Sequence, residues 1–147
     1  MIIRNFKNED LDQIMEIWLD SNIKVHSFIP ESYWEIVCGF VKRAIPMAEV
    51  YVCENDESIC GFIGLQDTYI AGLFVEDNSR CKGIGKMLLD HAKENREELT
   101  LNIYQKNERA IEFYKREQFA IKSETVDENT KEPEFVMTWK KIDEVTK

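Results

Sequence analysis

The chain has 147 residues, of which 44% are hydrophobic and 32% charged, a composition that fits one globular domain and not a disordered tail. No apolar run approaches the roughly 20 residues that a membrane span needs, and the first residues lack the features of a signal peptide. The net charge of −9 argues against nucleic acid, because phosphate neutralisation supplies most of the energy of that binding. We therefore expect one cytoplasmic domain over residues 1–147 that binds neither membrane nor nucleic acid.

Cysteine and histidine usage argues against a metal site. The four cysteines contain no C-x-x-C pair, and only two histidines accompany them. A structural zinc site takes four such ligands at short, regular spacings. We therefore expect no bound metal.

The N-terminal half predicts a strand, two helices and three more strands. Residues 2–5 form a short apolar strand. Asn8 is a suitable helix N-cap, since apolar residues at the spacing of an amphipathic helix follow it. Pro30 suits the start of a second helix, which Pro46 ends. The strands expected next cover residues 50–54, 58–65 and 69–75, with Asn55–Glu57 as the turn between the first two.

A helical period returns in the second half, after Gly83. Ile84, Leu88 and Ala92 lie on one face of this helix, and we expect His91 to face solvent. The order β-α-α-β-β-β-α-β-α-β-β predicts an α/β fold, a mixed twisted sheet with helices on both faces. The last four elements of that order are a strand at 99–104, a helix at 107–117 and strands at 119–126 and 135–139.

The segment between residues 72 and 86 carries the most specific chemical signal. An apolar strand runs into a turn and then into a G-x-G, flanked by three cations, that opens a helix. Glycines let a ligand approach the backbone, and the first N–H groups and the dipole of the helix favour an anion. The segment therefore predicts a site for phosphate or pyrophosphate. The cations are Arg80, Lys82 and Lys86.

Two common phosphate motifs do not match this segment. A P-loop needs G-x-x-x-x-G-K-[S/T], which the chain lacks. A dinucleotide-binding fingerprint needs a third glycine or alanine where this chain has Leu88. What remains is R-x-x-G-x-G, formed by Arg80, Gly83 and Gly85.

This motif, placed between a strand and a helix, resembles the acetyl-CoA loop of the GNAT family, the GCN5-related N-acetyltransferases. Downstream, Asn107, the run Ile111-Glu112-Phe113-Tyr114 and Phe119 resemble the second GNAT signature, N-x-x-A-x-x-F-Y-x-x-x-G-F. The order of elements is also that of GNAT proteins, so the resemblance covers nearly the whole chain. Two positions depart from the pattern, because Gln118 replaces the signature glycine and Cys81 lies inside the loop.

The resemblance implies a single N-acetyltransferase domain that uses acetyl-CoA and an amine acceptor, without metal. In this family the loop holds the pyrophosphate of the cofactor, while the pantetheine arm pairs with the main chain of the strand before the loop. The same strand can offer a backbone N–H to the thioester oxygen. The cofactor-binding residues that the resemblance implies are Leu73, Phe74, Val75, Arg80, Cys81, Lys82, Gly83, Ile84, Gly85, Lys86 and Asn107.

Two residues are candidates for proton transfer. Tyr114 matches the family tyrosine that protonates the leaving thiolate; the alternative is that it belongs to a packing stripe with Ala110 and Ile111. His26 is a candidate base, since its ordinary pKa lies near 6.5. The alternative bases are Glu31, Asp67 and Glu76.

The acceptor amine stays open at this point. His26, Phe28, Tyr33 and Trp34 are expected to shape its pocket, and an acidic surface would attract a cationic amine. A protein lysine, an N-terminal amine, a polyamine and an aminoglycoside all fit, as do a monomer and a homodimer. The alternative functions are a non-catalytic acyl-CoA-binding regulatory module and a nucleic-acid-directed acetyltransferase, the second disfavoured by the acidic charge.

Overall fold

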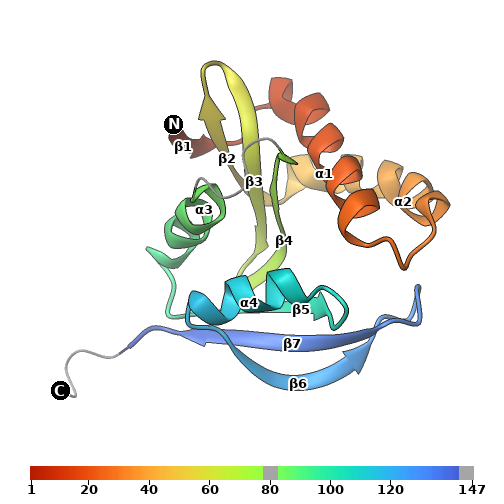
Figure 1. Cartoon of the computed structure of the whole chain (residues 1–147). Helices are drawn as coiled ribbons and strands as arrows, with labels where there is room; N and C mark the ends of the chain where they lie inside the picture. The colour runs from red at the N-terminus through yellow and green to blue at the C-terminus, as the bar shows by residue number, and fades with distance from the viewer. Residues whose placement is uncertain (78–82, 143–147) are drawn as a thin grey trace. The chain divides into compact units, whose positions relative to one another are not determined.

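The structure, a computed structural model, describes residues 1–77 and 83–142 and divides into two compact units, Met1–Ala92 and Lys93–Lys147 (Figure 1). The first unit contains β1 (Ile2–Asn5), α1 (Leu11–Val25), α2 (Glu31–Ala44), β2 (Glu49–Asn55), β3 (Ser58–Gln66), β4 (Tyr69–Val75) and α3 (Ile84–Lys93), whose last residue begins the second unit. The second unit contains β5 (Glu98–Tyr104), α4 (Glu108–Arg116), β6 (Ala120–Val126) and β7 (Pro133–Lys140). Short 3₁₀ helices cover Asn8–Asp10 and Ile45–Met47.

This order of strands and helices is the predicted one, so the α/β fold class is confirmed. The expected strand at 69–75 coincides with β4, and the other elements agree with their expected ranges to within two or three residues. Within the ranges that the structure describes, no helix is long and apolar enough to cross a membrane.

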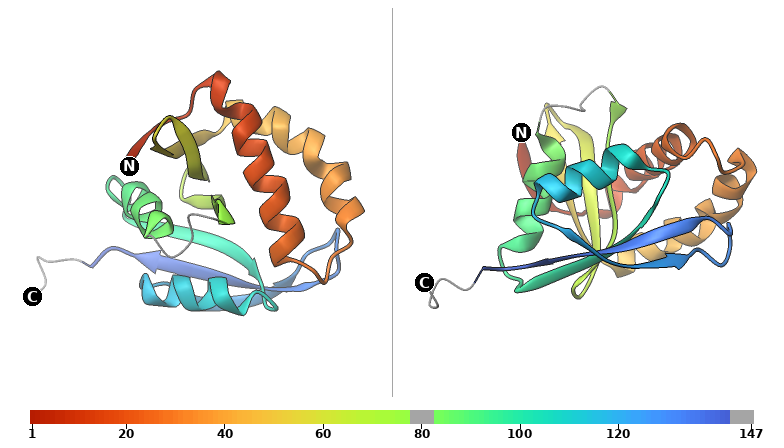
Figure 2. Two further views of the ribbon diagram at one scale, coloured as in Figure 1. Left: turned by 45° about the horizontal axis from the view of Figure 1, so that its top comes forward. Right: turned by 60° about the horizontal axis from the view of Figure 1, so that its bottom comes forward.

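In the first unit, β1, β2, β3 and β4 pair in this order, each antiparallel to its neighbour. Asp56 and Glu57 join β2 to β3 with φ of 51° and 67°, as the tight turn of a β-hairpin requires. Helices α1 and α2 lie on one side of β2–β4 and α3 lies on the other (Figures 1 and 2). The segment expected to bind the cofactor, between β4 and α3, therefore leaves the sheet at the end of its fourth strand.

The start of α1 differs from the prediction. Asn8 is not its N-cap, because the chain first makes a 3₁₀ turn that contains Asn8. The carboxylate of Asp10 instead accepts the N–H of Lys7 at 2.8 Å and both terminal nitrogens of Arg4 at 2.9 Å. These bonds to the Arg4 guanidinium hold the pKa of the buried Asp10 below its usual range. Asp10 therefore closes the 3₁₀ turn that precedes α1, and its side chain makes no cap bond to α1 itself.

Helix α3 packs closely against the sheet through a glycine. A Cβ atom on Gly61 would lie 2.9 Å from the carbonyl oxygen of Phe74 and 3.1 Å from Cγ2 of Ile84, closer than real Cβ contacts allow. Ile84, Leu88 and Ala92 are buried as predicted. The prediction for His91 was wrong, since its ring is half-buried and lies edge-on to Tyr51, 4.5 Å between centroids.

In the second unit, β7 lies between β5 and β6 and pairs antiparallel with both. The hydroxyl of Tyr104, at the end of β5, donates to Asp127 Oδ2 at 2.6 Å, which fixes the start of the β6–β7 turn. Ile111 and Tyr114 are the buried residues of α4. The candidate acid Tyr114 is thus carried by the buried face of a short helix.

Candidate functional site

Strand β4 presents the expected pantetheine segment. Leu73, Phe74 and Val75 are half-buried, and along one edge they pair with β3. The register shifts between Gly64 and Leu65 of β3, which places a β-bulge in β4; bulges of this kind re-aim backbone groups and are frequent next to active sites. The Phe74 ring stacks on that of Phe62, 5.3 Å between centroids and 29° between planes.

The start of α3 has the form of an anion site. Gly83 is exposed, with a φ of +78°, and a Cβ added to it would meet no described atom within 4 Å. Space is thus available at this position, but the left-handed backbone restricts it to glycine. Ile84 is buried in the core as its helical spacing predicts, with 2% exposed, so only its backbone can face a ligand. Lys86, in the first turn, forms an ion pair with Asp90 at 3.4 Å.

Three of the expected cofactor ligands, Arg80, Cys81 and Lys82, lie outside the described residues. The last described residue before them, Asp77, is held by a contact that the sequence did not indicate. Lys24 of α1 donates to Asp77 Oδ2 at 2.8 Å and lies 3.0 Å from Asp20 Oδ2. Its bonds to Asp77 and Asp20 raise the pKa of Lys24. Helix α1 therefore anchors the end of β4 where the loop begins.

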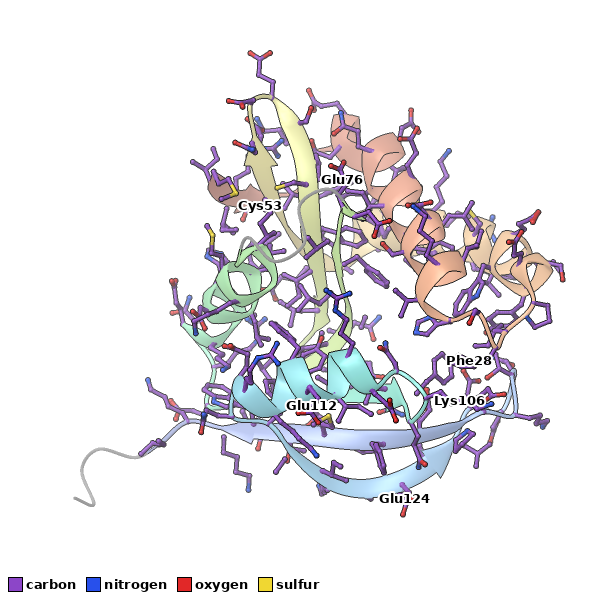
Figure 3. All side chains as sticks on the ribbon, viewed as in Figure 1. Phe28, Cys53, Glu76, Lys106, Glu112 and Glu124 are labelled. Carbon is purple, nitrogen blue, oxygen red and sulfur yellow. The ribbon has the colours of Figure 1, made fainter. Side chains whose placement is uncertain are left out.

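The residues expected at the acceptor side come together at the turn between α1 and α2. The His26 ring lies 5.5 Å from that of Trp34 and 5.6 Å from that of Phe28, which is labelled in Figure 3. Tyr33 meets Trp34 edge-on at 4.9 Å. We call these four residues, His26, Phe28, Tyr33 and Trp34, the aromatic cluster. Aromatic faces of this kind attract cations and pack against aliphatic chains.

A neighbouring asparagine fixes the proton position on His26. The Asn22 amide nitrogen donates to the Trp18 carbonyl at 2.9 Å, so its Oδ1 is the acceptor for His26 Nδ1, 3.1 Å away. Nδ1 therefore carries the hydrogen and Nε2 the lone pair. Asn22 was missed in the sequence, although its spacing of four residues from His26 on a helix predicts such a contact.

Burial keeps His26 uncharged. Loss of hydration lowers the pKa of the half-buried His26 from 6.5 to about 4, because an imidazole removed from much of its water does not readily hold a charge. The ring is therefore neutral at physiological pH. A neutral imidazole with so low a pKa can accept a hydrogen bond at Nε2, but it is a weak base and does not readily take up a full proton.

The alternative bases do not form one group. Glu31 and Asp67 are exposed, and Glu76 is half-buried, with its N–H bonded to the Cys60 carbonyl at 2.8 Å. Asp67 precedes β4 and Glu76 follows it, so the length of the strand, about 20 Å, separates them. Asp67 and Glu76 therefore do not share one acidic site.

In the second unit, Asn107 caps α4. Its Oδ1 accepts the N–H of Ala110 at 3.3 Å, a normal N-cap bond that explains this residue without a ligand.

Tyr114 is 7% exposed and lies edge-on to Phe113 and Phe119, at 5.1 and 5.3 Å. Burial raises the pKa of Tyr114 well above its ordinary value near 10. Its hydroxyl is therefore protonated at neutral pH, as a proton donor must be. The packing stripe that was the alternative is also present, because Ile111 is buried beside it on α4.

The end of α4 is closed by a Schellman motif. The N–H of Phe119 donates to the Tyr114 carbonyl at 2.9 Å, and that of Gln118 to the Lys115 carbonyl at 3.1 Å. Gln118 has a φ of +74°, at the position where the resembled signature has glycine. The Phe119 ring against Tyr114 is the apolar contact that accompanies this motif. The motif thus holds both the backbone and the ring of Tyr114.

The described part of the chain gathers no group of three or more His, Cys, Asp or Glu side chains that could hold a metal ion. Of the predicted site residues, the structure brings the aromatic cluster together on the first unit, with β4 and the start of α3 also in that unit. Asn107 and Tyr114 lie on α4 of the second unit.

Comparison with known proteins gives a consistent result. A family model for an acetyltransferase (GNAT) domain matches residues 46–121. The chain is 32% identical over 140 residues to the peptidyl-lysine N-acetyltransferase YiaC of Escherichia coli (strain K12), covering 94% of this chain and 96% of that protein. It is 30% identical over 120 residues to YjaB of the same organism, also a peptidyl-lysine N-acetyltransferase, covering 81% and 82%. The solution structure of apo YjaB from E. coli has a TM-score of 0.84 at 28% identity, covering 94% and 97%.

Proposed function

The chain belongs to the GNAT family of N-acetyltransferases, whose acetyl donor is acetyl-CoA, and we propose that its acceptor is the ε-amine of a lysine in a protein. The observation that carries this proposal is the sequence identity of 32% and 30% to two peptidyl-lysine N-acetyltransferases. The aromatic cluster supports it, because a lysine presents both an aliphatic stem and a cation to aromatic faces. We also propose that residues 1–147 act as one acetyltransferase domain.

The first task of the site is to hold acetyl-CoA. In this proposal the backbone of Gly83 and Gly85, with Arg80, Lys82 and Lys86, binds the pyrophosphate. The open space at Gly83 and its left-handed backbone fit that role. The main chain of Leu73–Val75 binds the pantetheine arm, joined by the Asn107 amide.

The second task is to present a neutral amine. A lysine ammonium with an ordinary pKa near 10.4 is almost fully protonated at pH 7. We assign its proton to solvent, because the pKa of His26, lowered to about 4 by burial, makes this side chain a poor acceptor of a full proton. His26 then acts by accepting a hydrogen bond from the amine at Nε2, which aims the nitrogen lone pair.

The third task is the acetyl transfer itself, in which acetyl-CoA supplies the acetyl group as a thioester. The amine nitrogen bonds to the carbonyl carbon, and the carbon–sulfur bond breaks. The nitrogen then loses one proton to solvent, and solvent returns a proton to Tyr114 after the transfer. A backbone N–H of β4 stabilises the negative charge that develops on the carbonyl oxygen. The Tyr114 hydroxyl donates its proton to the departing sulfur, which avoids release of a free thiolate.

The test is a Tyr114→Phe variant assayed for free CoA release with a lysine-containing protein. We expect kcat to fall by about 10- to 1000-fold while the affinity for CoA, measured by calorimetry, stays nearly unchanged. Tyr51→Phe is the matched control, since it removes a tyrosine hydroxyl outside the proposed site. Normal turnover of the Tyr114→Phe variant would show that this tyrosine serves packing alone.

The lysine assignment has its own test. The wild-type enzyme is offered a lysine peptide, the same peptide with a free N-terminus and no lysine, a polyamine and an aminoglycoside. We expect kcat/KM to be highest for the lysine peptide. A higher value for any of the others assigns the acceptor to that class and leaves the acetyltransferase activity in place.

A further inference from the structure

The outward face of α2 is apolar although it faces solvent. Ile36 and Phe40 lie one helical turn apart and are 72% and 66% exposed. Met47, in the 3₁₀ turn that continues the helix, is 89% exposed. The opposite face packs on α1, where Trp34 meets Trp18 edge-on at 5.9 Å. Large apolar side chains gathered on one exposed helix face indicate an interaction surface.

The charges on α2 are arranged symmetrically about this face. Glu31 and Glu35 occupy its N-terminal half, and Lys42 and Arg43 its last turn. Lys42 is directed toward α1, since its Nζ lies 3.8 Å from Asp12 Oδ1. On the exposed face the opposed charges are therefore Glu35 and Arg43, with the exposed Gly39 midway between them.

Arg43 reinforces the apolar face. Its guanidinium lies 5.0 Å from the centroid of the Phe40 ring, so the cation and the aromatic ring present one combined surface. A Cβ on Gly39 would meet only the Arg43 guanidinium, at 3.5 Å. Gly39 contributes no side chain, so at the centre of the face only the flexible Arg43 side chain separates two approaching helix backbones.

We propose that α2 pairs with α2 of a second copy of this chain, antiparallel and related by a twofold axis at Gly39. An interface of this type uses the same patch on both subunits, which must therefore be complementary to itself. Antiparallel pairing about Gly39 places Glu35 of each copy opposite Arg43 of the other and lays Ile36 and Phe40 against each other's helices.

The pattern fits a second copy better than a different partner. A uniformly acidic or basic partner would satisfy one half of α2 and repel the other half. Two chains of net charge −9 repel each other, but α2 carries two acidic and two basic side chains, so the repulsion is least where the helices meet. Because one pair of short helices buries little area, the dimer is weak, with a dissociation constant on the order of 10–100 μM.

Sedimentation velocity over a concentration series tests the proposal. We expect the wild type to shift from monomer to dimer, and Phe40→Glu to stay monomeric up to about 1 mM. Ile142→Glu is the matched control, because Ile142 is 71% exposed outside α2, and it should dimerise like the wild type. Glu35→Arg and Arg43→Glu should each weaken the dimer at least tenfold, because each places like charges together twice. The double variant should restore it.

The outcomes separate this proposal from the enzymatic one. A wild type that stays monomeric up to about 1 mM overturns it, as does a double variant weaker than both single variants. If Phe40→Glu sediments as the wild type does at every concentration but has a raised KM for the acceptor protein, the dimer proposal is overturned in favour of acceptor docking on α2. CoA binding by calorimetry is expected to be equal in all these variants, so dimer formation is read independently of activity.

Discussion

At the scale of single residues, Gln118 occupies a position that suits glycine. Its φ of +74° is left-handed, and a side chain with a Cβ costs about 0.5–1 kcal/mol in this region relative to glycine. The hydrogen bonds and the Phe119–Tyr114 contact of the Schellman motif nonetheless form around it. The departure from the family signature therefore costs stability and leaves the position of Tyr114 intact.

We accordingly expect Gln118→Gly to raise the free energy of unfolding by roughly 0.5–1 kcal/mol, measured by urea denaturation. Lys115→Gly is the control, because it places glycine inside the same helix and should lower stability by about 1 kcal/mol. Catalysis should be unchanged in Gln118→Gly. A loss of stability in that variant would mean that the glutamine side chain makes a contribution of its own.

His26 makes folding depend on pH. Its pKa is lowered by burial from 6.5 to about 4, so between these values the unfolded chain binds a proton that the folded chain does not. The free energy of unfolding is therefore expected to fall by up to about 3 kcal/mol as pH drops from 6.5 to 4, and to be unaffected by this residue above 6.5.

Urea denaturation at a series of pH values, compared between the wild type and His26→Gln, isolates this contribution. The difference in stability between the two proteins should shrink as the pH falls through that window, because carboxylates titrate in both and cancel. A difference that stays constant from pH 4 to 7 would contradict the buried, neutral state of His26.

At the scale of elements, the distance between α3 and the sheet is set by Gly61. A Cβ there would lie 2.9 Å from the Phe74 carbonyl oxygen, whereas the nearest atom to a Cβ on Gly64, in the same strand, is Val50 Cγ2 at 4.0 Å. Gly61 and Gly64 both lie in β3, but only Gly61 has other atoms close to the position of an added Cβ. Of these two glycines, Gly61 is therefore the one that lets β4 and the start of α3 take their positions.

We expect Gly61→Ala to lower the free energy of unfolding by about 1–3 kcal/mol, because the backbone of β4 must move, and to weaken CoA binding through that movement. Gly64→Ala is the matched control and should cost much less. Denaturation and calorimetry with CoA give the two readouts. Equal effects of the two substitutions would show that the packing at Gly61 is not limiting.

The helices and strands also show how much of the fold the sequence patterns predict. The bounds of β4 followed from an apolar run between two clear turns, and the buried face of α3 from its helical period. The cap at Asn8 was wrong because the preference for asparagine as a cap does not distinguish the start of an α-helix from that of a 3₁₀ turn. Asn22 was missed because a polar residue inside a helix normally faces solvent, and here the histidine one turn later reverses that preference. The strand order β5–β7–β6 follows from pairing between distant segments, which no local period encodes.

At the scale of the whole molecule, the acidic charge favours cationic acceptors. A net charge of −9 attracts lysine-rich substrates at long range, and salt screens this attraction once the Debye length falls below about 8 Å. Asp67 and Glu76 lie at opposite ends of β4, so we attribute the attraction to the summed charge and not to one acidic cluster.

We therefore expect kcat/KM for a lysine peptide with basic neighbours to fall several-fold between low and high salt. A peptide with neutral neighbours around the same lysine is the control, and its kcat/KM should change less. Initial rates of CoA release at both ionic strengths give the comparison. If kcat/KM for the two peptides changes equally with salt, the surface charge does not contribute to the choice of substrate.

The position of β7 has a consequence for how the chain is made. In the second unit, β7 is the partner of both β5 and β6, yet it is synthesised after both of them. The strands of the first unit pair within the first 92 residues, so that sheet can assemble while synthesis continues. β5 and β6 lack their shared partner until Pro133–Lys140 has been synthesised. A nascent chain that stops before Pro133 thus exposes two strand edges that the finished second unit covers, and such edges favour aggregation.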